Sequence, residues 1–139
     1  MKTIVLISCA SKKLSRPAKA RDIYASSLFK LNLKFAESLR PDKVFILSAK
    51  HGLLELEKVI EPYNTTLNNL GLKELKAWAE TVLQQLAQAA DLKNDKFVIL
   101  AGEKYRKHLL PSMKNFEIPL EGLGIGKQLK FLKEKASNE

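Results

Sequence analysis

The chain has 139 residues, of which 45% are hydrophobic, and this is enough for one domain, residues 1–139, with an apolar core rather than a disordered chain. Its single cysteine, Cys9, excludes an internal disulfide framework and fits a reducing compartment such as the cytoplasm. The net charge of +9 favours polyanionic partners such as nucleotides or nucleic acid, although lysines scattered over solvent-facing helices would give the same total.

Three short apolar runs predict buried strands at residues 3–8, 43–48 and 96–101. Each run is rich in Val, Ile, Leu or Phe and does not alternate with polar residues, which is typical of strands covered on both faces of a parallel sheet. The first run is too short to span a membrane and lacks the longer apolar region of a signal peptide. We therefore expect a strand there and no membrane among the partners.

A helix is predicted between the first and second strands. Ser26 or Ser27 can cap its start, and Pro41 closes its end. Its apolar residues recur at helical spacing and predict one buried face, which consists of Leu28, Leu31, Phe35 and Leu39.

A longer helix, capped by Asn68 or Asn69, is predicted before the third strand. Its apolar stripe comprises Leu72, Leu75, Ala79, Val82, Leu83, Leu86 and Ala90. After the third strand we expect a short helix, a fourth strand within 116–120, and a last helix from about Ile125 with the last few residues frayed. This alternation indicates an α/β fold of three layers, in which a short, mostly parallel sheet of about four strands carries helices on both faces.

In an open parallel sheet, ligands bind outside the carboxyl ends of the strands. Each predicted strand passes at that end from apolar residues to a small residue and then to cations. The candidate ligand-binding residues are Ser8, Cys9, Ser11, Lys12 and Lys13 after the first strand, Ser48, Lys50 and Gly52 after the second, and Gly102, Tyr105 and Arg106 after the third. Backbone N–H groups and cations at this edge would hold an anion, most simply a phosphate. The alternative is that these are ordinary polar loops.

Cys9 has two interpretations. Near Lys12 and Lys13 it could be a thiolate nucleophile, whereas the interpretation we favour is a small residue packed at a strand end. A phosphatase-type loop needs five residues between cysteine and arginine, and six separate Cys9 from Arg16. His51 has no visible partner and is interpreted as a surface residue. With two separated histidines and dispersed carboxylates, we expect no metal site and no cofactor.

Two loop segments carry the candidate catalytic carboxylates, Asp22 and Glu61. Asp22 lies with Arg21 and Tyr24 in a segment that could fold over the strand ends as a flap, and Glu61 precedes Tyr63 in the long loop. A carboxylate there could activate water or stabilise an oxocarbenium-like sugar, and either tyrosine could stack on a base. The alternative is a structural loop in which the tyrosine packs on the core.

A glycine-rich segment, residues 122–127, opens the last helix and ends on Lys127. Its spacing is one residue short of the phosphate-loop motif, and Gln128 replaces the metal-binding Ser or Thr, which excludes a nucleoside triphosphatase of that type. The helix start with Lys127 could still bind a single phosphate. The alternative is a turn that lets the last helix pack closely.

Six segments form a set spread over nearly the whole chain. They are Ile-Ser-Cys-Ala-Ser-Lys-Lys from residue 7, Ala-Arg-Asp-Ile-Tyr-Ala-Ser-Ser-Leu-Phe from residue 20, Leu-Ser-Ala-Lys-His-Gly-Leu-Leu from residue 47, Ile-Glu-Pro-Tyr-Asn-Thr-Thr-Leu from residue 60, Ala-Gly-Glu-Lys-Tyr-Arg from residue 101 and Pro-Leu-Glu-Gly-Leu-Gly-Ile-Gly-Lys-Gln-Leu from residue 119. Through them the chain resembles a bacterial and phage family of single-domain proteins classed as a domain of unknown function. Ala10 departs from the small or basic residue expected at its position in the Cys-Ser-Lys-Lys type of loop.

The family's Cys-Ser-x-x-Lys loop and Lys-x-Gly turn are similar to those in a domain of archaeosine synthase and tRNA-guanine transglycosylase proteins. That domain looks like the uracil-DNA glycosylase fold, and some relatives are labelled by analogy with YaaA-type proteins, which bind DNA. The resemblance implies nucleosides, nucleotides or nucleic acid as ligands.

These observations lead to a protein that binds a phosphate-bearing ligand at the carboxyl edge of its sheet. One hypothesis is an enzyme acting at an N-glycosidic bond of a nucleotide or nucleic-acid base, as a glycosidase or a transferase, with Lys12, Lys50 and Arg106 holding phosphate. The alternatives are a non-catalytic nucleic-acid-binding module and a nucleotide-sensing module.

Overall fold

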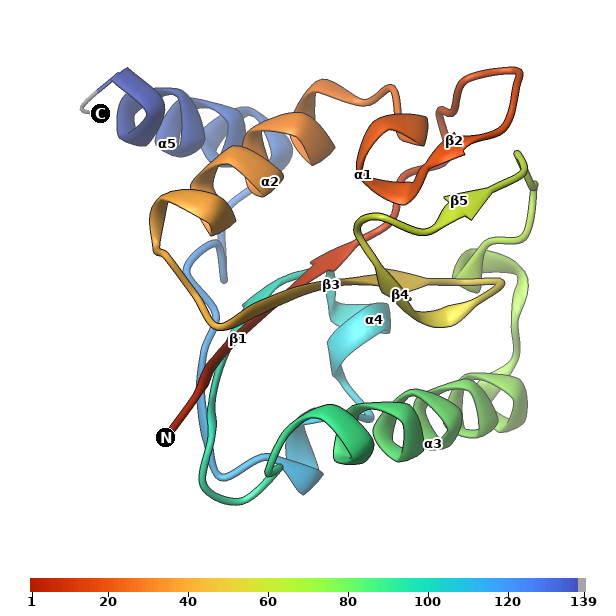
Figure 1. The fold of residues 1–139 in the computed structure, drawn as a ribbon, viewed down its shortest axis with the longest axis vertical. Coiled ribbons are helices and arrows are strands. Elements are labelled where there is room, and N and C mark those ends of the chain that lie inside the picture. Colours follow the sequence, from red (N-terminus) through yellow and green to blue (C-terminus); the bar gives the residue numbers. More distant parts are fainter. Residues whose placement is uncertain (138–139) are drawn as a thin grey trace.

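The structure, a computed structural model, describes residues 1–137. Its main sheet has five strands in the order β4-β3-β1-β6-β7 (Figure 1). Four of them are parallel, and β4 runs antiparallel to β3. The strands are β1 (Thr3–Ser8), β3 (Lys43–Ser48), β4 (Gly52–Glu55), β6 (Lys96–Leu100) and β7 (Asn115–Glu117). A separate antiparallel pair joins β2 (Ala18–Lys19) to β5 (Val59–Ile60).

The central strand, β1, explains why its sequence does not alternate. Residues 4–7 are fully buried, because β3 and β6 pair with its two edges and helices cover its two faces. Val5 and Ile7 pack into one cluster of buried residues, and Ile4 and Leu6 pack into the other. The α/β prediction with a mostly parallel sheet is therefore confirmed.

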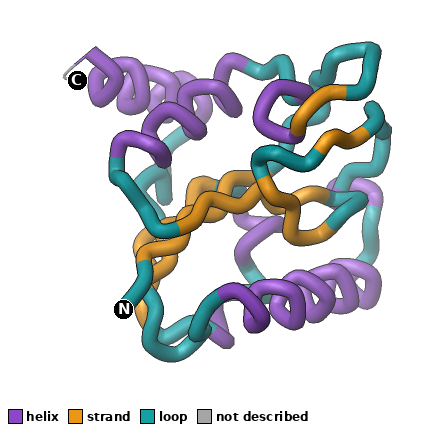
Figure 2. The backbone as a smooth tube through the Cα atoms, viewed as in Figure 1, coloured by secondary structure: helices purple, strands orange, loops and turns teal. Residues whose placement is uncertain are grey.

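Helices lie on both sides of the sheet and make three layers (Figures 1 and 2). The helices α1 (Ala20–Ile23), α2 (Ser27–Ser38) and α5 (Ile125–Ser137) cover one face, and α3 (Leu72–Ala89) covers the other. Short helical segments complete the chain, namely α4 (Glu103–Arg106) and 3₁₀ turns at Leu67–Asn69 and Leu110–Ser112. Residues 138–139, part of the tail expected to be frayed, lie outside the described residues.

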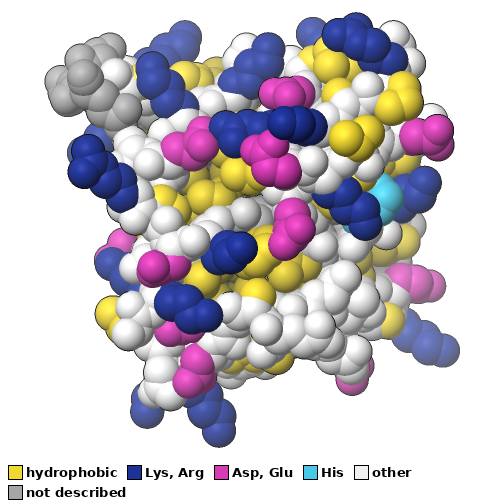
Figure 3. Space-filling view, viewed as in Figure 1, with side chains coloured by type: hydrophobic (Ala, Val, Ile, Leu, Met, Phe, Trp, Pro, Cys, Tyr) yellow, Lys and Arg dark blue, Asp and Glu magenta, His cyan; other side chains and the backbone are white. Residues whose placement is uncertain are grey.

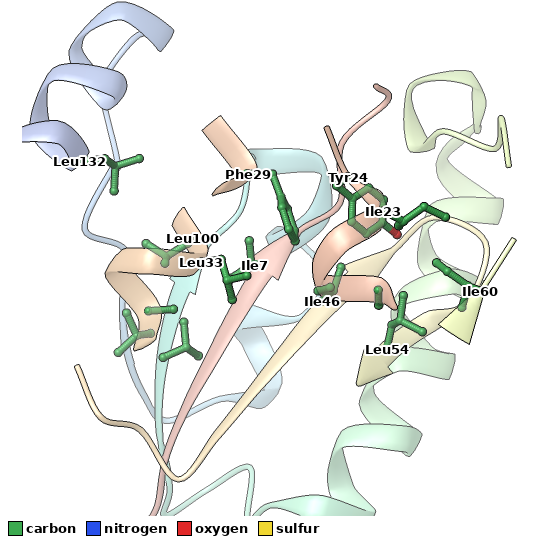
Figure 4. Packing of buried hydrophobic residues seen from close by; sticks show 14 of the residues in the cluster. Ile7, Ile23, Tyr24, Phe29, Leu33, Ile46, Leu54, Ile60, Leu100 and Leu132 are labelled. Atoms are coloured by element: carbon green, nitrogen blue, oxygen red, sulfur yellow. The ribbon is translucent and has the colours of Figure 1, made fainter. Parts of the chain in front are cut away.

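The core under α1 and α2 is continuous from β4, at one edge of the sheet, across β3 and β1 to β6. Phe29 and Leu33 of α2 meet Ile7 and Ile46 of the sheet, and Tyr24 lies beside Ile23 in the same cluster (Figure 4). Burying one such aliphatic or aromatic side chain stabilises the fold by about 1.5–3 kcal/mol. This packing fixes the segments that follow the strands.

The predicted helix caps have different outcomes. Ser26 caps α2 as expected, since its side-chain oxygen accepts a hydrogen bond from the backbone N–H of Phe29 at 3.3 Å. The prediction that Asn68 or Asn69 caps the long helix is wrong, because both belong to a 3₁₀ turn capped by Thr66 and α3 begins only after Gly71. The predicted start of the last helix at Ile125 is confirmed.

The predicted apolar face of α2 is rotated from the observed one. Leu39 is 42% exposed, and the residues that α2 buries are Phe29, Asn32, Leu33 and Ala36. The rotation arises because α2 packs against both the sheet and α5, so the leucines of the predicted stripe lie partly toward α5. Leu72, at the start of the predicted stripe of α3, is likewise 60% exposed.

The predicted sheet of about four strands lacked β4, β2 and β5. These segments are four residues or shorter, and their apolar runs are only one or two residues long. The strand expected within 116–120 is β7, which lies slightly earlier in the chain. Gly52 permits the turn into β4, as predicted, because its backbone has φ +72°.

Candidate functional site

The parallel strands end together at one edge of the sheet. The strand order puts β1 at the centre, with the chain continuing to β3 on one side and to β6 on the other. The loops after β1 and β6 therefore diverge and leave a crevice between them, which is the place where ligands bind in open α/β sheets. We call this place the switch point.

A cavity of about 320 Å³ lies at the switch point. Its walls come from the ends of β1 and β6, from α4, and from the two helices α2 and α5 on the same side of the sheet. The lining residues of this switch-point cavity are Ser8, Leu28, Asn32, Ile99, Leu100, Ala101, Gly102, Tyr105, Arg106, Ile118, Leu120, Ile125 and Gln128. It is mostly apolar, with a few polar groups among the walls.

A second, more polar cavity of about 230 Å³ follows Cys9. Tyr105 lines both cavities, so its ring is a shared wall. The lining residues of this Cys9 cavity are Cys9, Ala10, Ser11, Lys13, Asn64, Thr65, Thr66, Asn68 and Tyr105. The loop after β1 and the loop before α3 thus face each other across it.

Asn32 is the unusual residue of the switch-point cavity. Its side chain is in the buried face of α2, and the residue is only 5% exposed. Among residues 1–137, its side-chain oxygen Oδ1 is buried without a hydrogen-bond partner. Most buried polar atoms in proteins are hydrogen-bonded, so an unpaired acceptor on a residue that lines a cavity is informative.

Two other polar side chains of this cavity are anchored to the backbone. Arg106 donates from Nη1 to the carbonyl oxygen of Ala101 at 2.8 Å, and Gln128 donates from Nε2 to the carbonyl oxygen of Leu123 at 2.8 Å. These hydrogen bonds fix where the two side chains lie. The guanidinium group of Arg106 has five N–H donors, so one such bond leaves donors for a ligand.

A buried network of hydroxyl groups supports the edge beneath the Cys9 cavity. The hydroxyl of Tyr63 is hydrogen-bonded to that of Tyr24 at 2.6 Å and to Ser48 Oγ at 2.8 Å. Ser48 Oγ also accepts a hydrogen bond from the backbone N–H of His51, and the Ser48 carbonyl accepts one from Trp78 Nε1. Burial raises the pKa of Tyr24 to about 12 and also raises the pKa of Tyr63, so both phenols are protonated at neutral pH.

Lys13 lies over this network. Its Nζ is 4.3 Å from the ring centroid of Tyr63 and 5.7 Å from that of Tyr24, which are cation–π distances. Nζ also donates to the carbonyl oxygen of Ser11 at 3.2 Å. Burial lowers the pKa of Lys13, and the neighbouring Cys9 acts in the opposite direction. The ammonium group is therefore held in place at the Cys9 cavity.

Cys9 is partly buried in the wall of the Cys9 cavity. Its Sγ lies 3.4 Å from the hydroxyl of Tyr105, and Trp78 packs edge-on against the Tyr105 ring. This placement fits the packed strand-end residue that the sequence favoured, yet the thiol still lines a cavity. His51, which was expected at the surface, packs its ring edge-on against Tyr63, and burial lowers its pKa, with Lys50 and Lys58 adding to the effect.

The predicted site residues divide into three groups. Seven line the two cavities: Ser8, Cys9, Ser11, Lys13, Gly102, Tyr105 and Arg106. Four are structural residues of the edge: Tyr24, Ser48, Gly52 and Tyr63. Neither tyrosine ring is exposed for a base to stack on, because Tyr24 is 0% and Tyr63 is 7% exposed.

The remaining predicted residues lie outside both cavities. Lys12, Lys50, Glu61 and Lys127 are exposed and line neither cavity. Asp22 and Arg21 line a separate hollow beside α2. Arg21 is engaged there by Glu37 at 2.9 Å and Glu57 at 3.1 Å. Lys13 and Tyr24 form an isolated backbone bridge, and the flap over the strand ends stays a prediction.

Two further hollows within residues 1–137 are larger than these cavities but are poorer candidates. The hollow beside α2 has a volume of about 670 Å³, and the one at the amino end of β3 about 440 Å³. The walls of both carry side chains of both signs, and in the hollow beside α2 the side chains of Arg21 and Glu37 form an ion pair. Because carboxylates line both hollows, neither offers an anion walls that are free of repulsion.

Within residues 1–137, no three His, Cys, Asp or Glu side chains lie close enough together to hold a metal ion. No helix within this range is sufficiently long and apolar for a membrane crossing.

The comparison with protein families covers almost the whole molecule. A family model described as a family of unknown function, DUF6884, matches residues 4–134. The chain belongs to this family. No curated protein and no solved structure is significantly similar to the chain. The more distant likeness to uracil-DNA-glycosylase-like and YaaA-type proteins stays a prediction.

Sequence reasoning missed several of the lining residues of this DUF6884 protein. Asn32 was not singled out, although a polar residue three positions after Phe29 and four before Ala36 shares a helix face with them. Residues 64–66 and Asn68 belong to the loop before α3, and only its tyrosine and carboxylate had been considered. A polar residue within an apolar helix face is a signal that could have identified Asn32.

Proposed function

We propose that the protein binds a phosphate-bearing small molecule, such as a nucleotide, at the carboxyl edge of its sheet. The ligand lies across the Cys9 cavity and the switch-point cavity. The observation that carries this proposal is the charge of the walls: Lys13 lines one cavity and Arg106 the other, and the lining residues of both include no Asp or Glu.

The Cys9 cavity suits the phosphate group. Hydroxyl and amide side chains surround Lys13 there, contributed by Ser11, Thr65, Thr66, Asn64 and Asn68. Such neutral donors and one or two cations bind phosphate without the repulsion that a carboxylate would add. The ammonium of Lys13 is already held over Tyr63, so little side-chain freedom is lost when a ligand binds.

A small molecule is favoured over a long nucleic acid. On the face shown in Figure 3, lysines and arginines lie among carboxylates and do not form one continuous basic surface. Nucleic-acid binding surfaces gather cations in a patch or stripe. The walls of the two cavities, by contrast, carry cations without carboxylates.

The proposal is one of binding, not of catalysis. Chemistry at an N-glycosidic bond would require a carboxylate near the sugar. Asp22 and Glu61, the residues that the sequence offered for this role, line neither cavity. The enzymatic hypothesis therefore has no support from the positions of these two groups.

Thermal unfolding in the presence of candidate ligands tests the proposal. The panel contains inorganic phosphate, nucleosides, nucleoside mono-, di- and triphosphates, and short oligonucleotides. A ligand at about one hundred times its dissociation constant stabilises the folded state by roughly 2.7 kcal/mol. We expect a rise in melting midpoint with phosphate-bearing small molecules.

Matched lysine variants locate the binding. Lys13→Met should abolish most of the rise, because it removes the ammonium and keeps an apolar stem over Tyr63. Lys12→Met is the control, since Lys12 is exposed and lines neither cavity. Equal losses in both variants would show that total charge rather than the cavity attracts the ligand. A rise only with oligonucleotides, fading with salt, would favour a nucleic-acid-binding module.

A further inference from the structure

Asn32 places an unpaired hydrogen-bond acceptor among apolar residues of the core. Its residue is 5% exposed, and its Oδ1 has no partner among the described residues. The neighbours on the same helix face, Phe29, Leu33 and Ala36, are apolar and buried. A leucine would fit the pattern of this face better, so the amide is a cost to the fold unless something donates to it.

The rest of the switch-point cavity restricts what that donor can be. Apolar side chains such as Leu28, Leu100 and Leu120 supply most of its walls, and Tyr105 supplies another. The lining contains no carboxylate, so no wall selects for a cation. A planar, uncharged ring with an N–H or amino group on its edge satisfies both the apolar walls and the acceptor.

We propose that the switch-point cavity is a subsite for a nucleobase or a similar planar heterocycle, whose N–H or amino group donates to Asn32 Oδ1. This inference rests on the proposed function, in which the phosphate lies in the Cys9 cavity beyond the ring of Tyr105. The ligand class is then a mononucleotide rather than a sugar phosphate or free phosphate. Arg106, anchored on the Ala101 carbonyl, lies in the same cavity with guanidinium donors left for the ligand.

Calorimetric titration separates the base from the phosphate. The ligands are the four common nucleoside 5′-monophosphates, their parent nucleosides, ribose 5-phosphate and inorganic phosphate. We expect at least one mononucleotide to bind about tenfold more tightly than ribose 5-phosphate, since one hydrogen bond to a buried group contributes roughly this factor. The N-methylated form of the tightest nucleotide, blocked at the donating position, should lose this advantage. This comparison needs no variant of the protein.

Asn32→Leu tests the acceptor itself. We expect it to reduce the affinity for the mononucleotide to that for ribose 5-phosphate, and to raise the melting midpoint of the free protein because the unpaired amide is removed. Asn69→Leu is the control, because Asn69 is exposed and lines neither cavity. An unchanged preference for the base in Asn32→Leu would overturn the proposal.

The outcomes distinguish this inference from the proposed function. If ribose 5-phosphate binds as tightly as every mononucleotide, the base subsite is refuted and the phosphate site stands, with Asn32 paired only to water. If a nucleoside binds, with an affinity that depends on Asn32, and its phosphate adds nothing, the subsite stands and the phosphate site is refuted. If no member of the panel binds, both are refuted.

Discussion

At the amino end of the parallel sheet, carboxylates accept hydrogen bonds from backbone N–H groups, whereas near its carboxyl end a buried side-chain oxygen has no hydrogen-bond donor among the described residues. Asp95 accepts hydrogen bonds from the backbone N–H groups of Lys2 and Asp91, each at 2.8 Å, and Asp42 accepts one from Thr3 at 2.7 Å. At the switch point, Asn32 Oδ1 has no such donor among residues 1–137. The two carboxylates directly precede strands β3 and β6, and Asn32 belongs to helix α2, which covers the same sheet, yet only the carboxylates have hydrogen-bond donors.

The paired carboxylates at the amino end stabilise the fold, whereas the unpaired Asn32 near the carboxyl end destabilises it. Hydrogen bonds from backbone N–H groups to a charged carboxylate stabilise the folded chain. An unpaired buried amide destabilises it, and such costs concentrate at functional sites. Changes at the amino end should therefore alter stability and leave ligand binding intact, and changes at the cavities should alter binding.

Asp95→Asn gives the largest expected loss of stability. The residue is 4% exposed, and its two oxygens each accept a backbone hydrogen bond. An amide turns one of these acceptors into a donor that faces an N–H group, so we expect the melting midpoint to fall by several degrees. The control is Glu117→Gln at the same end, where an exposed ion pair with Lys96 is removed and little change is expected. A ligand-induced shift lost in Asp95→Asn would break the separation between the two ends.

The same residue gives a pH dependence with a definite sign. Hydrogen bonds from the backbone of Asp91 and Lys2 hold the pKa of Asp95 below its ordinary value of about 3.9. A carboxylate with a lowered pKa stabilises the fold above that ordinary value, and this stabilisation is lost as the pH falls through the folded-state pKa. The stability difference between wild type and Asp95→Asn should be widest near neutral pH and shrink below about pH 4. Urea unfolding at pH 7 and pH 3 measures it, and a constant difference would contradict the assignment.

Tyr63→Phe should have the next largest effect. It removes the hydroxyl that bridges Tyr24 and Ser48, and both partners are buried. Ser48 Oγ keeps the hydrogen bond from the His51 backbone N–H, but the buried Tyr24 hydroxyl loses its bond to Tyr63, and such a loss costs about 1–3 kcal/mol in the free energy of unfolding. Tyr105→Phe is the comparison, with a smaller loss, because its partner is the weakly hydrogen-bonding thiol of Cys9. If urea denaturation gives equal losses of unfolding free energy for Tyr63→Phe and Tyr105→Phe, the buried hydroxyl network does not stabilise the carboxyl edge of the sheet more than the weak bond to Cys9 does.

Local rules were sufficient for the elements that form the edge. The apolar runs ending at Ser8, Ser48 and Leu100 are long and uninterrupted, so their strands and the polar residues behind them follow from the sequence. The glycine at position 52 was interpreted correctly, because a turn into β4 needs its positive φ. In each case the identity of residues close together in the sequence was sufficient to predict the local structure.

Residues whose role depends on tertiary packing were not predictable in this way. Asn32 matters only because α2 turns that face toward the core, and the leucine spacing of the helix indicated another face. Arg21 was expected at the ligand, but Glu37 and Glu57 from distant segments engage it. Tyr24 was expected to stack on a base, but the core cluster closes over it. Each outcome depends on contacts that sequence spacing does not encode.

Gly52→Ala and Gly102→Ala sharpen the contrast with two glycines of the same edge. At Gly52, φ is +72° and an added Cβ would lie 2.5 Å from Gln85 Oε1, which accepts from the Leu53 backbone N–H. We expect Gly52→Ala to lose about 1–2 kcal/mol of unfolding free energy from the left-handed backbone alone. At Gly102 an added Cβ meets nothing within 4 Å, so stability should not change. Because Gly102 lines the switch-point cavity, its variant should instead weaken nucleotide binding in the calorimetric titration.

The smallest effects are expected for Asp22→Asn and Glu61→Gln. Both carboxylates are exposed and line neither cavity, so the affinity for a nucleoside monophosphate should change less than about twofold in either variant. The loss of nucleotide affinity produced by Lys13→Met is the reference against which these small changes are compared. The same samples should be assayed for release of free base by chromatography. If wild type releases base and either variant does not, that carboxylate acts on a bound ligand, and helix α1 or the loop at residues 61–64 must move toward the cavities when the nucleotide is present. If no base is released by any of them, the edge of the sheet binds its ligand without cleaving it, and the role of the protein follows from what it binds.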